Sequence, residues 1–163
     1  MNTQQPQNPV TKRAQTLENA YWYGASLMTV LVDGTQTNGR YAQIEATLQP
    51  GGEPPVHTHT REDETFYLLE GSIRFTIGEH VFTAHPGDYV LMPKNIAHSF
   101  KVLTPSAKAV LTIAPAGFEN YFRDPRMAIP APSLTLPPAP QGPPPAHVIQ
   151  TFVQILDEYG VKM

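Results

Sequence analysis

Length, composition and charge indicate one globular domain and exclude several classes of function. The chain has 163 residues, of which 40% are hydrophobic and 15% are charged, a balance typical of a single soluble domain. The formal net charge of −3, with no long run of Lys or Arg, argues against nucleic acid or a membrane as the partner. Because the chain has no cysteine, disulfides, thiolate metal sites and cysteine nucleophiles are excluded. The chain shows no secretory signal and no apolar run of membrane-spanning length, which predicts a cytoplasmic protein.

The first two thirds of the chain predict short strands. Residues 1–16 are polar and contain two prolines, so we expect a loose N-terminal arm. A strand is expected over residues 26–32, and residues 40–49 alternate between apolar and polar as in a half-buried strand. Further apolar stretches, separated by Gly and Pro turns, bring the expected count to about nine or ten strands before residue 115. This spacing predicts an all-β fold, an antiparallel sandwich or barrel over residues 17–126.

The last part of the chain, residues 127–163, has a different pattern. The preceding stretch FENYFRDPR predicts one helical turn, and the proline-dense residues 127–146 predict an extended crossing segment. Residues 147–159 predict an amphipathic helix, packed on the outside of the barrel or on a second subunit. Its apolar positions are Val148, Phe152, Ile155, Leu156 and Tyr159.

The stretch GGEPPVHTHTREDETFYLLEG carries the strongest chemical signal. His57 and His59 are two residues apart, so on a strand their side chains share a face. Glu64 follows a polar turn and opens an apolar run, and a returning antiparallel strand would bring its carboxylate beside the two imidazoles. Two neutral imidazoles and one carboxylate form a facial ligand set for a divalent first-row metal. His98, in the later block GDYVLMPKNIAHSF, is a fourth candidate ligand.

The spacing of these two blocks resembles the two sequence motifs of the cupin superfamily. The first block runs from Gly51 to Gly71 and matches at every defining position. The second block matches at Gly87, Pro93 and His98. The stretches YWYG, DETFYLLEG, PAGFENYF and DEYGVKM further resemble single-domain cupins of the quercetin-dioxygenase type.

Two positions of the second block depart from the usual motif. Asn95 stands where the motif has Gly, and Val102 stands where it has Asn. The first departure lies in a turn and the second on a strand, and neither changes a candidate ligand. Asn also tolerates the left-handed backbone conformation that Gly would supply, so we expect the turn to survive.

The resemblance implies a fold, a metal site and an assembly. It implies a double-stranded β-helix, or jelly-roll, barrel with one metal ion at its centre, frequently as a homodimer. The implied ligands are His57, His59, Glu64 and His98. Imidazole and carboxylate suit Fe, Mn, Ni, Co, Cu or Zn, and the sequence does not choose among them. Open positions on the ion can take water, dioxygen or a small-molecule substrate.

The pocket beside the metal is expected to be apolar. Parity with Glu64 places Phe66 and Leu68 on the inward face, and parity with His98 places Phe100 and Val102 there. Such walls favour an aromatic or otherwise apolar substrate. In flavonol-cleaving cupins the residue matching Glu64 acts as ligand and as base, so the resemblance implies a catalytic role for it.

Other polar and aromatic groups have less specific interpretations. The charged turn Arg61-Glu62-Asp63 is expected to be simply solvated, and gating or support of the ligands is the alternative. Tyr21, Trp22 and Tyr23 either line the mouth of the barrel or belong to its core.

Three functions fit these residues. The first is a metal-dependent dioxygenase acting on a small aromatic or enolisable compound. The second is a non-oxidative isomerase, decarboxylase or lyase, which would need an additional acid or base in the pocket. The third is a binding module without catalysis. Because one barrel hosts many chemistries, the fold does not decide among them.

Overall fold

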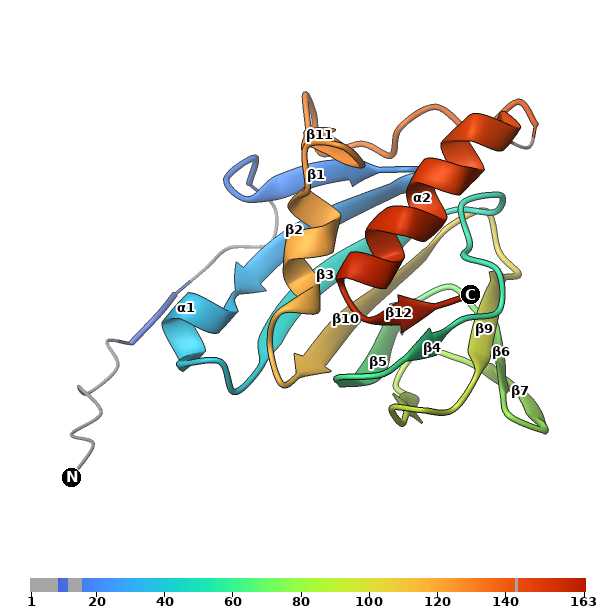
Figure 1. Cartoon of the computed structure of the whole chain (residues 1–163), viewed down its shortest axis with the longest axis horizontal. Helices are drawn as coiled ribbons and strands as arrows, with labels where there is room; N and C mark the ends of the chain where they lie inside the picture. The colour runs from blue at the N-terminus through green and yellow to red at the C-terminus, as the bar shows by residue number, and fades with distance from the viewer. Residues whose placement is uncertain (1–8, 12–15, 143) are drawn as a thin grey trace.

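The computed structural model describes residues 9–11, 16–142 and 144–163 of the chain (Figure 1). Of the predicted N-terminal arm, residues 1–16, twelve residues lie outside this described part. Within it, ten strands precede residue 115, as the turn spacing predicted. No helix of the described part is long and apolar enough to cross a membrane. The strands are β1 (Ala20–Tyr23), β2 (Ser26–Val32), β3 (Ala42–Leu48), β4 (Thr58–His59), β5 (Asp63–Glu70), β6 (Ile73–Ile77), β7 (His80–Ala84), β8 (Tyr89–Met92), β9 (His98–Val102) and β10 (Ala107–Ala114).

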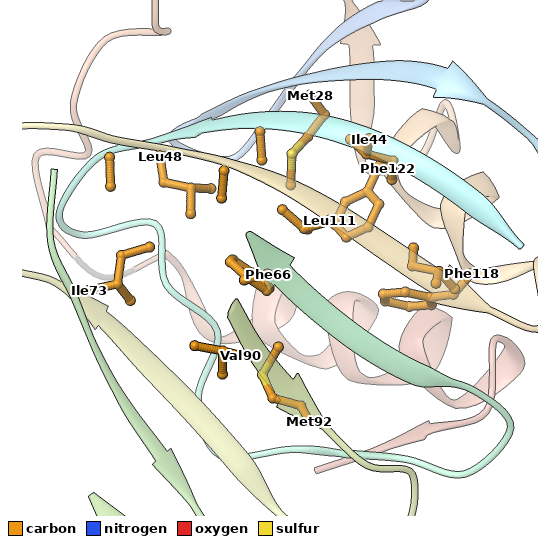
Figure 2. Packing of buried hydrophobic residues seen from close by; sticks show 14 of the residues in the cluster. Met28, Ile44, Leu48, Phe66, Ile73, Val90, Met92, Leu111, Phe118 and Phe122 are labelled. Atoms are coloured by element: carbon orange, nitrogen blue, oxygen red, sulfur yellow. The ribbon is translucent and has the colours of Figure 1, made fainter. Parts of the chain in front are cut away.

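Two sheets of antiparallel strands enclose one core. The larger sheet has the order β11-β1-β2-β3-β10-β5-β8, where β11 is Ala128–Pro130, and the smaller sheet has the order β7-β6-β9. The buried cluster between them takes Ile44 and Phe66 from the larger sheet and Ile73 and Phe75 from the smaller one. Figure 2 shows Ile73 pointing toward Leu48 and Phe66 across this core. Burial of apolar side chains from both sheets therefore holds the barrel together.

Local sequence patterns explain most of the strands and turns. The alternating residues of β3 behave as predicted, because Ala42, Ile44, Ala46 and Leu48 are all buried while their neighbours are not. Asn95 adopts the left-handed conformation, with φ of 64°, as expected for an Asn in the place of Gly. A short helix, α1 (Gly34–Thr37), follows β2, because the Asp33 carboxylate accepts hydrogen bonds from two backbone N–H groups of its first turn.

The chain after the barrel returns to cover it. The expected helical turn is a 3₁₀ helix, η1 (Phe118–Arg123), and the expected amphipathic helix is α2 (Ala146–Glu158). Between them the proline-rich segment lacks many N–H donors, and barrel side chains bond its carbonyls instead. Trp22 Nε1 donates to the Thr135 carbonyl at 2.9 Å, and Gln49 Nε2 donates to the Pro137 carbonyl at 2.7 Å.

The last strand, β12 (Val161–Lys162), joins the C-terminus to the barrel. It pairs antiparallel with β4, so that Val161 lies opposite His59. In Figure 1, α2 lies across the barrel and leads directly into this strand. Ile155 and Leu156 of the predicted apolar face are buried, whereas Val148, near the start of the helix, is 40% exposed. The C-terminal segment is therefore anchored at its end, next to one of the predicted metal ligands.

Candidate metal centre

Four predicted ligands, which come from separate segments, converge at one point inside the barrel. His59 lies on β4, with His57 directly before it, while Glu64 lies on β5 and His98 opens β9. His57 and His98 also exchange two backbone hydrogen bonds, of 3.0 Å and 2.8 Å, which fix the two segments side by side. One ligand atom from each of the four residues lies within 4.8 Å of the others, and all four residues are buried.

The hydrogen bonds of the histidine rings leave one nitrogen of each ring free for a ligand. The Nδ1 atom of His57 bonds the Pro55 carbonyl, and the Nδ1 atom of His98 bonds the Ile96 carbonyl, both at 2.9 Å. A carbonyl only accepts hydrogen bonds, so each Nδ1 carries the proton and each Nε2 presents a lone pair. This is the tautomer that binds a metal through Nε2.

Two of these Nε2 atoms have no hydrogen-bond partner. Within the described residues, the Nε2 atoms of His59 and His98 are buried and unsatisfied. The nearest carboxylate oxygen, Glu64 Oε2, lies 3.8 Å from the first and 3.9 Å from the second, beyond hydrogen-bond range. Leaving a buried acceptor unpaired costs about 1–3 kcal/mol, which a metal ion at this point would remove. The residues therefore fit a divalent cation.

Burial sets the charge of the ligands. It lowers the pKa of His57 to about 4, with a smaller contribution from the neighbouring His98, and it also lowers the pKa of His98. Both imidazoles are thus neutral near pH 7, as metal ligands must be. Burial raises the pKa of Glu64, while the nearby His59 opposes that shift. These shifts belong to a dry site that favours a compensating positive charge.

Glu62 is a buried partner of the site that sequence reasoning assigned to solvent. Its carboxylate Oε1 lies 2.5 Å from the Nδ1 atom of His59, and only 3% of the residue is exposed. Burial opposes the charged form of His59, but the hydrogen bond to Glu62 and the charges of Glu64 and Glu62 outweigh it and raise its pKa. The expectation that the turn is simply solvated is therefore wrong for Glu62 and holds for the exposed Arg61. Glu62 and Glu64 are two residues apart, so on a strand they share a face, and this spacing could have predicted that Glu62 points toward the site.

A small apolar cavity adjoins three of the four ligands, His57, His59 and Glu64. Its volume is about 50 Å³, room for roughly three or four water molecules. Of the predicted pocket residues, Phe66 and Phe100 line it. Leu68 and Val102 are buried in the core and do not line the cavity, because strand parity gives the face of a residue but not its height along the barrel.

Much of the cavity wall comes from segments distant in the sequence. The 3₁₀ helix contributes Phe118 and Tyr121, and α2 contributes Phe152 and Leu156. Tyr23 also lines the cavity, and its hydroxyl lies 2.7 Å from that of Tyr121. Burial raises the pKa of each of these tyrosines, so both hydroxyls stay protonated. The pair adds two uncharged hydroxyl groups to a wall that is otherwise largely apolar.

Comparisons with known sequences point to one family. Residues 44–114, which include all four candidate ligands, match the family described as "Cupin domain". A quercetin 2,3-dioxygenase of Bacillus subtilis (strain 168) is 28% identical over 100 residues, which cover 61% of this chain and 30% of that protein. A quercetin 2,3-dioxygenase of Aspergillus japonicus is 30% identical over 71 residues, which cover 40% of this chain and 20% of that protein. The chain spans less than a third of the length of either relative.

Solved structures share the fold. A nucleoside dehydratase from Streptomyces superposes with a TM-score of 0.53 and is 22% identical, and the match covers 68% of this chain and 88% of that one. At this identity the likeness concerns the fold alone. Together with the family match, it confirms the predicted all-β barrel.

Proposed function

We propose that this chain, whose residues 44–114 match the cupin domain family, holds one divalent first-row transition metal ion between the two sheets of its barrel. The proposed ligands are His57, His59, Glu64 and His98. The observation that carries this proposal is the pair of buried Nε2 atoms, on His59 and His98, that have no hydrogen-bond partner. Such atoms are rare in folded proteins, and a metal ion bound at this point would satisfy both of them.

The proposed reaction is a metal-dependent dioxygenation of a small enolisable or aromatic compound. When bound, the ion would polarise the substrate as a Lewis acid and, if redox-active, exchange electrons with dioxygen. The names of the two curated relatives and the apolar cavity wall support this assignment. A dioxygenase adds both oxygen atoms to its substrate, so oxidation of the substrate balances reduction of dioxygen without an external reductant.

The protein groups have separable roles in this reaction. Glu64 would accept the proton of an enol or hydroxyl held beside it, because a carboxylate has a second oxygen that can take a proton, whereas the Nδ1 atoms of His57 and His98 already carry one. Phe66 and Phe100 would exclude water from the site. The cavity of about 50 Å³ favours a compact substrate, since a flavonol-sized molecule would require movement of the wall formed by α2.

A second candidate function is a non-oxidative isomerisation or elimination at the same centre. This reaction needs a proton donor besides the carboxylate, and the bonded hydroxyls of Tyr23 and Tyr121 on the cavity wall offer one. Two hydroxyls joined by one hydrogen bond keep one O–H free, and that group can donate to a substrate oxygen. This candidate does not consume dioxygen.

Elemental analysis of protein purified without an affinity tag tests the metal assignment. We expect about one first-row metal ion per chain, and a sharp loss of metal in His57→Ala, His59→Ala and His98→Ala. His80→Ala is the matched control, because this histidine is exposed and is not one of the four residues whose ligand atoms converge. Unchanged metal content in all three ligand variants would refute the site.

Turnover in the presence and absence of dioxygen then separates the two reactions. Protein loaded with Fe, Mn, Ni or Co would be incubated with a panel of catechols, diketones and flavonols while dioxygen uptake is recorded. Uptake that matches substrate loss supports the dioxygenase. Substrate loss that continues without dioxygen favours isomerisation or elimination.

A further inference from the structure

The three histidines of the metal centre are held in two different ways. The Nδ1 atoms of His57 and His98 each donate to a backbone carbonyl two residues earlier in the chain, at 2.9 Å. The Nδ1 atom of His59 instead meets the carboxylate of Glu62, at 2.5 Å. A carbonyl orients a ring without adding net charge, whereas a carboxylate orients it and adds a full negative charge.

Glu62 is held in place by the turn that carries it. Its side chain is almost completely buried, and its partner His59 is 1% exposed. The carbonyl of Gly160 accepts hydrogen bonds from both the backbone N–H and the hydroxyl of Thr60, at 3.0 Å and 2.6 Å. The C-terminal segment therefore fixes the turn between His59 and Glu62. A charged side chain is seldom buried so deeply unless it has a partner, and here the partner is a candidate ligand.

The two carboxylates of the site make its charge suitable for a dication. Glu64 and Glu62 both approach His59, one toward Nε2 and the other toward Nδ1. When an ion is bound and the imidazoles are neutral, two ionised carboxylates bring a charge of −2 to the site. A divalent ion makes the centre electrically neutral, which removes most of the cost of keeping charges out of water.

We propose that Glu62 is a positioning residue of the metal centre, which fixes the ring of His59 and supplies the second negative charge that a divalent ion needs. This inference rests on the metal centre proposed above. It assigns Glu62 no contact with the ion or the substrate. The Glu62 carboxylate makes the Nε2 atom of His59 more electron-rich, whereas the other two histidines are supported by backbone carbonyls.

Titration with Co²⁺ tests this role with four variants. Glu62→Gln keeps the size of the side chain and can still accept the Nδ1–H bond, but loses the charge. Glu62→Ala loses both the charge and the hydrogen bond, and Glu62→Asp keeps the charge on a shorter side chain. Asp63→Asn is the matched control, because it removes the same charge one residue away, where Asp63 instead accepts a bond from the backbone N–H of Lys94.

The expected affinities for Co²⁺ separate charge from orientation. We expect Glu62→Gln to bind about 10-fold and Glu62→Ala about 100-fold more weakly than the natural protein, while Glu62→Asp recovers part of the loss. Asp63→Asn should stay within about twofold, because this half-buried charge is partly screened by solvent and bonds the backbone of Lys94 rather than a ligand. The visible absorption of bound Co²⁺ should shift in Glu62→Gln and remain unchanged in Asp63→Asn.

Thermal unfolding distinguishes this role from a purely structural one. Glu62→Gln should lower Tm more when Co²⁺ is bound than when a chelator is present. If Glu62 had only a structural role, the substitution would lower Tm equally under both conditions. Equal affinity and equal spectra in Glu62→Gln and the natural protein would overturn the role of Glu62 and leave the metal centre intact. Failure of the natural protein to bind Co²⁺, Fe²⁺, Mn²⁺, Ni²⁺ or Zn²⁺ would overturn the metal centre itself, and the role of Glu62 with it.

Discussion

The protein itself orients each histidine of the proposed metal centre. The ring of His59 packs edge-on against Phe118, with centroids 4.5 Å apart, and lies nearly parallel to the ring of His98, with an interplanar angle of 10°. The hydrogen bonds at Nδ1 fix the remaining rotation of each ring. Because little side-chain freedom is left to lose, more of the metal–ligand energy appears as affinity.

The hydroxyl pair on the cavity wall gives a prediction about stability. Tyr23→Phe leaves the hydroxyl of Tyr121, a residue only 1% exposed, without its bonding partner, so we expect a loss of about 1–3 kcal/mol. Tyr121→Phe should cost a similar amount. The double variant should lose less than the sum, because it leaves no unpaired hydroxyl. Urea denaturation of the four proteins measures the coupling, and additive losses would show that the bond contributes little.

At the scale of elements, one carboxylate connects the 3₁₀ helix to the end of α2. Asp124, directly after η1, accepts hydrogen bonds from the guanidinium of Arg126, the shorter at 2.7 Å, and from the hydroxyl of Tyr159, at 3.1 Å. Arg126 also reaches Glu158 at 2.8 Å. Both η1 and α2 contribute to the cavity wall, so this cluster holds two parts of the wall together.

The cluster predicts how stability depends on pH. The hydrogen bond from Arg126 holds the pKa of Asp124 well below its usual value of 3.8, although burial opposes the shift. A carboxyl with a lowered folded-state pKa stabilises the fold above its unfolded pKa and loses that contribution as pH falls through the folded one. Asp124→Asn should therefore destabilise the protein equally between about pH 5 and 8, and progressively less below about pH 4. Urea denaturation at several pH values measures this difference, and a difference that does not shrink in acid would contradict it.

Prediction from sequence succeeds here where the signal is local. The alternation of Ile44 and Ala46 fixes the face of β3, and the spacing of His57 and His59 places both side chains at one point. Pairing of His59 with Val161, and of Tyr23 with Tyr121, joins residues about a hundred positions apart. No periodicity encodes such contacts, so β12 and much of the cavity wall could not be predicted.

At the scale of the whole molecule, the proposed metal centre would join parts of the barrel that are otherwise held by packing. Glu64 belongs to the larger sheet and His98 to the smaller one, while His59 lies on the strand that pairs with the C-terminus. An ion shared by these segments would cross-link all three. Binding to the folded state alone then stabilises the entire fold rather than one loop.

The stability gained on metal binding can be predicted from mass action. At a free metal concentration 100 times the Kd, the fold should gain about 2.7 kcal/mol, and for a chain of this size Tm should rise by roughly 5–10 °C. Differential scanning calorimetry with Co²⁺ and with a chelator measures the shift. His98→Ala should abolish most of it, because one of the four ligands is gone, whereas His80→Ala, altered at an exposed position on β7, should retain it. A shift of equal size in His98→Ala would mean that the stabilising ion binds elsewhere, since a centre that joins the two sheets requires the ligand from β9.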